Sequence, residues 1–86
     1  MTTEEIRQRV KRVIHQVTNV PIDSIADHAS FVEDLELDSL ALLEVGVDVD
    51  YEFRLGIEDL EDRLGEMPTV DHVARFVQAE LERRAS

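Results

Sequence analysis

Apolar residues recur at helical spacing in three separate segments of this 86-residue chain, and this pattern restricts the possible fold more than any other feature. In the first segment, Thr2 and Glu5 have the spacing of a helix-capping box. The stripe that follows consists of Ile6, Val10, Val13, Ile14 and Val17. Asn19-Val20-Pro21 ends the segment, because the residue before a proline avoids helical backbone angles. We therefore predict an amphipathic first helix of about four turns.

The second segment, residues 40–53, is compatible with two kinds of secondary structure. Its alternating apolar residues are typical of a β-strand; they are Val45, Val47, Val49, Tyr51 and Phe53. Read with a helical period, the segment instead has two neighbouring apolar stripes. One consists of Leu42, Val45, Val49 and Phe53, and the other of Leu40, Leu43 and Val47. A strand here would lack a hairpin partner in this chain, so we predict a helix.

A short acidic segment and the third apolar segment follow. Residues 57–64 are short, acidic and amphipathic, which predicts a short helix ended by Gly65. Thr69 is a suitable N-cap for a last helix, and Arg83 and Arg84 suit its C-terminal end. The apolar stripe of this helix consists of Val70, Val73, Phe76, Val77 and Leu81. Apolar side chains are also expected to hold the long loop before the second helix against the bundle; they are Ile22, Ile25 and Phe31.

Together these segments predict an all-α fold, a small bundle of three main helices plus one short helix, with residues 1–86 forming a single domain. A chain of this length buries only about 60 to 65% of its unfolded surface, so its core is thin and leaves no room for a deep enzyme cleft. The sequence contains no cysteine, which excludes disulfides and thiolate metal sites. Any reactive thiol would therefore come from a cofactor.

Negative charge is concentrated in the middle of the chain. The net charge of -11 disfavours nucleic acid as a partner, because phosphates would be repelled over most of the surface. Between Val13 and Phe53 there are ten Asp or Glu residues and no Lys or Arg. Such a run can be an ordinary solvated face. Around a modifiable side chain, however, it predicts docking to basic partners, with electrostatic steering that weakens in salt.

The sequence shows no evident targeting segment. The first apolar residues are interspersed with Arg7, Arg9, Lys11 and Arg12, unlike a signal peptide. No run approaches the roughly 20 apolar residues that are needed to cross a membrane. We therefore expect a cytoplasmic protein that has no membrane partner.

Ser39 is the candidate site for chemistry, because it stands where an acidic loop turns into the second helix. If Asp38 caps this helix, Ser39 lies in its first turn, where unpaired backbone N–H groups and the helix dipole favour an anion. A phosphodiester on Ser39 would be stabilised there. From position alone, an ordinary helix-start residue is the more common explanation of Ser39.

Ser39 and the acidic loop belong to a wider motif. It consists of Phe31-Val32-Glu33-Asp34-Leu35, Leu37-Asp38-Ser39-Leu40, Glu44 one turn later, and Ile57-Glu58-Asp59 after the next loop. With this motif the chain resembles, over nearly its whole length, the acyl carrier proteins, in particular freestanding, phosphopantetheine-binding carriers of the fatty-acid or polyketide type.

The resemblance implies a prosthetic group on Ser39. In this family a phosphopantetheinyl transferase moves 4′-phosphopantetheine from coenzyme A onto the serine, with the help of Mg²⁺. Asp38 matches the family's acidic residue that positions the metal and the phosphate, and such oxygens are the ligands that magnesium prefers. No resident metal and no catalysis by the carrier itself are implied. The arm would hold acyl groups as thioesters and shuttle them between enzymes.

The resemblance also implies two surfaces around the arm. The partner-binding residues would be Leu40, Leu43, Glu44, Val47, Asp50, Ile57 and Glu58. They would meet the transferase and the ketosynthase, acyltransferase or reductase enzymes, with the carrier acting as a monomer. Leu43 and Val47 could instead be core residues. The pocket that shelters an acyl chain would be lined by Val45, Val49 and Phe53.

Some residues depart from the family pattern. Gly46 replaces a larger apolar residue, at a cost to the helix of about 1 kcal/mol relative to alanine, which close packing or room for an acyl chain would explain. Asp48 and Tyr51 replace small or acidic residues, and Gly65-Glu66-Met67 lengthens the connection to the last helix. The run Leu40-Ala41-Leu42-Leu43-Glu44 is somewhat closer to polyketide carriers than to housekeeping fatty-acid carriers.

Three other classes of function were compared with the carrier. Asp48, Asp50 and Glu52 alternate like calcium ligands, but Phe53 stands where an EF-hand loop needs glycine. A hydrolase would need a base for Ser39, and the chain offers only His15, His28 and His72, without a Gly-x-Ser-x-Gly elbow. The remaining alternative is a small acidic helical protein-interaction module without a prosthetic group, whose activity would not depend on Ser39.

Overall fold

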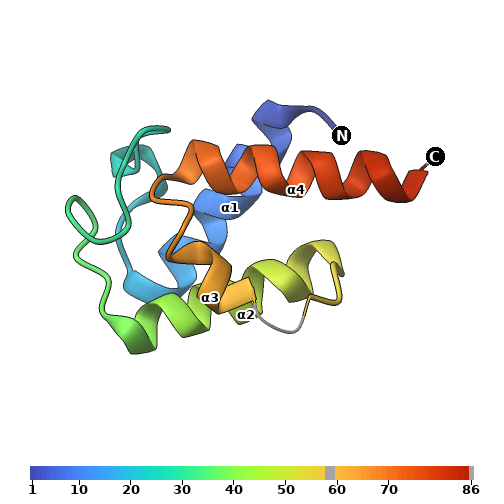
Figure 1. Cartoon of the computed structure of the whole chain (residues 1–86). Helices are drawn as coiled ribbons and strands as arrows, with labels where there is room; N and C mark the ends of the chain where they lie inside the picture. Colours follow the sequence, from blue (N-terminus) through green and yellow to red (C-terminus); the bar gives the residue numbers. More distant parts are fainter. Residues whose placement is uncertain (58–59, 86) are drawn as a thin grey trace.

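The computed structural model describes residues 1–57 and 60–85, and the secondary-structure elements in this part of the chain are helices (Figure 1). The elements are α1 (Thr3–Thr18), a single 3-10 turn η1 (Ile22–Ser24), α2 (Ser39–Phe53), α3 (Leu60–Leu64) and α4 (Val70–Ala85). The only β-type pairing in the described residues is one isolated antiparallel bridge between Ser30 and Thr69. The predicted all-α bundle of three main helices and one short helix is confirmed.

A single core joins the helices. α1 packs against both α2 and α4, and α3 lies against α2 (Figure 1). Buried side chains come from every helix and from the loop before α2, and Ile6, Ile14, Phe31, Val49, Leu60 and Val73 are among them. Most residues of the predicted inward stripes are buried. Four of them pack against the edge of the core and stay partly exposed: Val17, Leu42, Phe76 and Leu81. The thin core expected for this chain length thus draws on loop residues as well as on helices.

α1 has the predicted start and, at Asn19, the predicted end. The Thr2 and Glu5 side chains each accept the other's backbone N–H group, which completes the capping box. The helix ends at Asn19, whose φ of 65° is left-handed and whose N–H donates to the His15 carbonyl at 2.7 Å. Asparagine tolerates this conformation, so the C-cap stops the helix two residues before Pro21.

α2 separates its valines onto two faces, as a helix requires. Val45 and Val49 have 0% of their surface exposed, whereas Val47 between them is 54% exposed. In a strand all three side chains would lie on one face. The prediction of a helix over this segment is therefore confirmed. Gly46 is buried beside Val45, where a larger side chain would have to fit into the packed core.

We expect Val45→Ala to lower the free energy of unfolding by about 2 kcal/mol, since it removes buried methyl groups and leaves a cavity. Val47→Ala makes the same chemical change two residues away in the same helix, and should alter stability by no more than about 0.5 kcal/mol. Urea unfolding followed by circular dichroism measures both. Equal losses for the two variants would contradict the described orientation of α2.

The long loop between α1 and α2 is attached to the N-terminal end of α4 by its backbone. The N–H of Asp71 donates to the carbonyl of Asp27 at 2.9 Å, and the N–H of Val70 to that of Ala29 at 3.3 Å. In the other direction, the N–H of Phe31 donates to the Pro68 carbonyl at 3.0 Å. The loop thus satisfies N–H groups at the start of α4 that have no partner within the helix.

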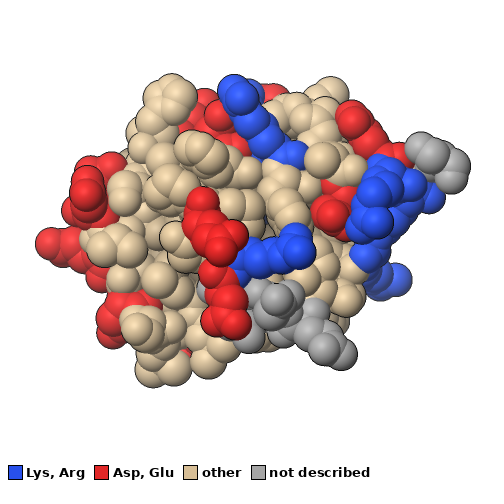
Figure 2. All heavy atoms as spheres, viewed as in Figure 1, with Lys and Arg blue, Asp and Glu red and all other residues tan. Residues whose placement is uncertain are grey.

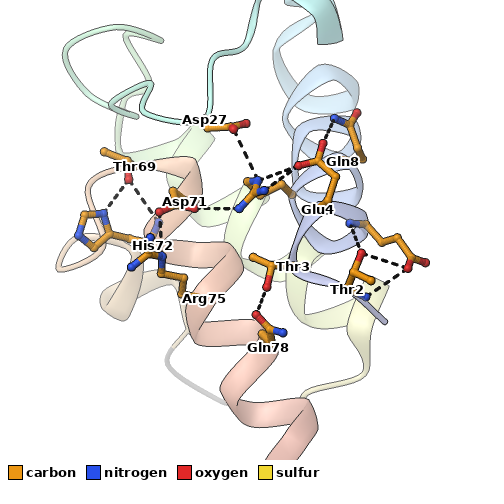
Figure 3. A network of polar contacts seen from close by, with 12 residues as sticks. Thr2, Thr3, Glu4, Gln8, Asp27, Thr69, Asp71, His72, Arg75 and Gln78 are labelled. Carbon is orange, nitrogen blue, oxygen red and sulfur yellow. Dashed lines mark hydrogen bonds and ion pairs between the residues drawn. The ribbon is translucent and has the colours of Figure 1, made fainter.

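Side chains attach the same loop to the core. Ile25 and Phe31 are buried as predicted, while Ile22 is only partly buried in η1. The Asp27 carboxylate lies 2.6 Å from the ammonium of Lys11, which is a buried residue. Arg7 lies 3.6 Å from Asp27 and 3.2 Å from Asp71, and so joins the loop, α1 and α4 (Figure 3).

This ion-pair network should make stability depend on acid pH. The hydrogen bond from Lys11, together with the charges of Lys11 and Arg7, holds the pKa of Asp27 below its ordinary value of 3.8. A lowered pKa in the folded state means that the carboxylate stabilises the fold at pH values above its unfolded pKa. This stabilisation is lost as the pH falls through the folded pKa.

Asp27→Asn should therefore lower stability at neutral pH and reduce the further loss of stability below about pH 4. Urea midpoints measured between neutral pH and strong acid test this. Asp23→Asn is the matched control, because the exposed Asp23 carboxylate forms no ion pair with any described residue. The linkage would be refuted if Asp27→Asn and the parent lost stability in parallel through the acid range.

The last two helices follow the prediction in the described residues. α3 covers Leu60–Leu64 and Gly65 follows it directly, as predicted, while residues 58–59 of the expected helix lie outside the described residues. Thr69 caps α4 by accepting the N–H of His72 at 3.3 Å, and Arg83 and Arg84 occupy the last turn. The connection between these helices passes beside the loop at Ser30, through the bridge to Thr69.

Candidate functional site

Ser39 is the first residue of α2, and Asp38 caps the helix as predicted. The Asp38 carboxylate accepts the N–H of Ala41 at 2.8 Å, and its carbonyl accepts the N–H of Leu42 at 2.9 Å. The Ser39 side chain is exposed. The hydroxyl therefore stands at the positive end of the helix dipole, open to solvent.

The start of α2 suits a phosphodiester on Ser39. The capping interaction uses the N–H of Ala41, while the N–H groups of Ser39 and Leu40 belong to the first turn, which has no intrahelical acceptors for them. These groups and the dipole stabilise an anion next to the serine oxygen. The exposure of Ser39 leaves room for a long substituent, so the residues present fit a phosphopantetheine group.

A buried residue just before the site fixes the start of α2. Leu37 is buried, and its N–H donates to the carbonyl of Phe31 at 2.8 Å. Farther back, the Asp34 carboxylate accepts the N–H of Ser30 at 2.8 Å and closes the turn. Glu36 adopts a left-handed φ of 55° between these anchors. The loop therefore presents Ser39 from a fixed backbone.

Two surface hollows lie along the seam between α2 and α3. One, of about 420 Å³, is lined by Ser39, Leu42, Leu43, Asp62 and Gly65. The other, of about 200 Å³, is lined by Ser30, Phe31, Val32, Glu33, Leu42, Leu64, Gly65 and Pro68. Leu42 and Gly65 line both hollows. The hollow at Ser39 thus continues toward the α3–α4 connection.

The residues predicted to line an acyl pocket lie deeper than these hollows. Val45, Val49 and Phe53 are buried in the packed core and line neither hollow. Sequence reasoning assigned Leu42 to the inward stripe and did not select Asp62 or Gly65. No pattern in the sequence signals that Asp62 and Ser39 line the same hollow, because the hollow depends on how α2 and α3 pack.

The outward face of α2 carries most of the predicted partner surface. Leu40 and Leu43 are 63% and 42% exposed, and Val47 and Glu44 are exposed beside them. The alternative assignment of Leu43 and Val47 to the core is therefore wrong. Asp50 accepts the N–H of Gly56 at 2.7 Å and so also serves the end of the helix.

The other two predicted partner residues lie beyond α2. Ile57 is partly buried and packs against the core. Glu58 lies outside the described residues. The proposed contact surface in the described part of the chain is therefore concentrated on α2.

Charge is distributed unevenly over the molecule. In the view of Figure 2, acidic side chains gather on the side where Figure 1 has the loop and the N-terminal end of α2. Lys and Arg side chains are grouped most densely at the opposite side, near the C-terminal end of α4, where Arg83 and Arg84 are located. The Ser39 end of the molecule is thus the acidic end.

The geometry does not favour the rival functions. His15 contacts the Val20 carbonyl and His72 contacts the Thr69 hydroxyl, so both rings are engaged away from Ser39. Asp48, Asp50 and Glu52 lie within α2 and not in a loop. Among residues 1–57 and 60–85, no three acidic or histidine side chains are grouped to hold a metal ion, and no helix has the length and apolar character to span a membrane.

Comparison with known proteins identifies the family. A sequence model described as "Phosphopantetheine attachment site" matches residues 8–77. An acyl carrier protein of Thermobifida fusca is 32% identical over 75 residues, which are 87% of this chain and 92% of that protein. A meromycolate extension acyl carrier protein of Mycobacterium leprae is 35% identical over 78 residues, 91% of this chain and 66% of that protein.

A solved structure agrees with the sequence relatives. The acyl carrier protein of Enterococcus faecalis matches with a TM-score of 0.71 and 25% identity, over 93% of this chain and 99% of that one. This chain therefore belongs to the acyl carrier protein family. Its phosphopantetheine attachment domain implies 4′-phosphopantetheine as the prosthetic group.

The capping role of Asp38 can be separated from its charge. Asp38→Ala should lower the free energy of unfolding by about 1 kcal/mol, because the N–H of Ala41 loses its acceptor. Asp38→Asn keeps a capping oxygen and should lose little stability. Thermal or urea unfolding of both variants decides this. If Asp38→Asn were as unstable as Asp38→Ala, a cap through the side-chain oxygen would not account for the stability of this helix start.

Proposed function

We propose that this protein carries acyl intermediates as thioesters on a 4′-phosphopantetheine arm attached to Ser39, and delivers them to the enzymes of a fatty-acid or polyketide pathway. The observation that carries the proposal is the position of Ser39. It is the exposed first residue of α2, capped by Asp38, within the stretch that matches the attachment-site family. The protein itself catalyses no reaction in this proposal.

The residues around Ser39 have distinct tasks. When bound, the arm supplies a terminal thiol, which this cysteine-free chain does not have. The N–H groups of the first turn of α2 stabilise the negative phosphodiester. Asp38 holds the helix start and presents a carboxylate to the Mg²⁺ that the transferase uses during attachment.

The hollow beside Ser39 offers shelter to a short part of the cargo. Leu42 and Leu43 give it apolar walls, and the carboxylate of Asp62 lies at its edge. A longer acyl chain would have to separate Leu42 from α3 before it reached Val45 and Val49, which are fully packed. We therefore retain Val45, Val49 and Phe53 as a deeper pocket that opens only around a long cargo.

The acidic end of the molecule selects the partners. Exposed Leu40, Leu43 and Val47 supply contact area, and Glu44 supplies a charge next to them. A phosphopantetheinyl transferase and the ketosynthase, acyltransferase or reductase enzymes would bring basic surfaces to this face. We place the carrier in the cytoplasm as a monomer, where weak and rapidly reversible docking suits a shuttle.

Intact mass spectrometry tests the proposal directly. We expect the purified protein, incubated with coenzyme A, Mg²⁺ and a broad-specificity phosphopantetheinyl transferase, to gain the mass of one phosphopantetheine group. Ser39→Ala should gain nothing, while Ser24→Ala, a change at another exposed serine, should be modified like the parent. If the folded parent showed no gain with an active transferase, a helical interaction module without a prosthetic group would be the better description.

A further inference from the structure

Tyr51 is 84% exposed, the highest value among the large apolar side chains that stand out from the described surface. It continues the outward face of α2, because the spacing Leu40, Leu43, Val47, Tyr51 is three, four and four residues. The helix propensity of tyrosine is only average, and the exposed side chain of Tyr51 does not contribute to the core. Its place on the stripe indicates a contact with another molecule.

Tyr51 lies far from the attachment serine along the same helix. Tyr51 lies twelve positions after Ser39, which corresponds to about 18 Å along the helix axis at roughly 1.5 Å per residue. The exposed stripe begins at Leu40, directly after Ser39, and ends at Tyr51, and none of its four residues is buried. A protein that reaches Ser39 and lies along α2 would also cover Tyr51.

The two ends of this face differ in charge. Near Ser39, the exposed Glu44 stands among the apolar residues, and the acidic loop precedes the helix. Near Tyr51, the two acidic residues Asp50 and Glu52 have partners within the chain. Glu52 lies 3.3 Å from the guanidinium of Arg9, and Asp50 accepts the N–H of Gly56 at 2.7 Å. Arg54 then follows at the end of the helix.

We propose that Tyr51 is the aromatic anchor of the docking face, and that the partner is a basic enzyme surface with an apolar pocket that receives this ring. Attraction between charges would act mainly at the Ser39 end, through Glu44. At the far end, burial of the tyrosine ring would strengthen binding, since this ring loses little conformational freedom when it is buried. This inference rests on the proposed carrier function and adds a residue that decides which partners bind well.

Steady-state kinetics with the transferase separate these two contributions. The substrate is the unmodified protein, titrated against the enzyme with coenzyme A and Mg²⁺ in excess. We expect Tyr51→Ala to raise KM about tenfold and to leave kcat nearly unchanged, since the ring binds the enzyme far from the reacting serine. Tyr51→Phe retains the ring and should behave like the parent.

The second measurement is the dependence of these KM effects on salt concentration. The KM effect of Glu44→Gln should shrink at high ionic strength because charge attraction is screened, while that of Tyr51→Ala should persist. Tyr51→Gln, which removes the ring but keeps a good helix former, should match Tyr51→Ala. Circular dichroism melting of each variant confirms that the helix is intact.

Parent-like KM values in both Tyr51→Ala and Tyr51→Gln, with Ser39 still modified, would overturn the anchor and leave the carrier function standing. A Tyr51→Ala effect that disappeared in salt, or that Tyr51→Phe reproduced, would also overturn it. If the parent gained no phosphopantetheine at all, both the anchor and the carrier function would be wrong, and the intact mass distinguishes that case from the others.

Discussion

The attachment of the loop between α1 and α2 is the constraint on which the rest of this structure depends. Residues 19–38 contain only one 3-10 turn, yet they must deliver Ser39 to a defined place. Asp27 holds the loop against α1 and α4, because its carboxylate pairs with Lys11 and Arg7 and its carbonyl accepts the N–H of Asp71. The same residue thus compensates a buried ammonium, caps α4 and orders the loop.

The structure divides α2 into a face that stabilises and a face that is available to partners. Val45 and Val49 are buried against α1 and the rest of the core, while the stripe from Leu40 to Tyr51 is exposed. Because the two faces share no residues, changes in partner choice need not cost stability. Asp50 is the exception, since it both lies on the predicted partner surface and holds the N–H of Gly56.

At the site, a fixed backbone carries the exposed side chain of Ser39. Leu37 is buried two residues before Ser39, and Asp38 accepts the N–H of Ala41 two residues after it, so the backbone on both sides of the serine is fixed. The side chain nonetheless points into solvent beside a hollow formed with α3. A carrier needs this combination, because the arm must move while its attachment point is recognised by several enzymes.

The sequence alone predicted the helices and the proposed attachment at Ser39, because apolar spacing, the capping residues and the acidic motif are local patterns. It left three matters to the tertiary structure. The exposure of Leu43 and Val47 depends on how α2 packs against the other helices. The hollow formed by Leu42, Asp62 and Gly65 depends on where α3 lies against α2. The network of Arg7, Lys11, Asp27 and Asp71 joins residues distant in the chain, and only folding brings their charges together.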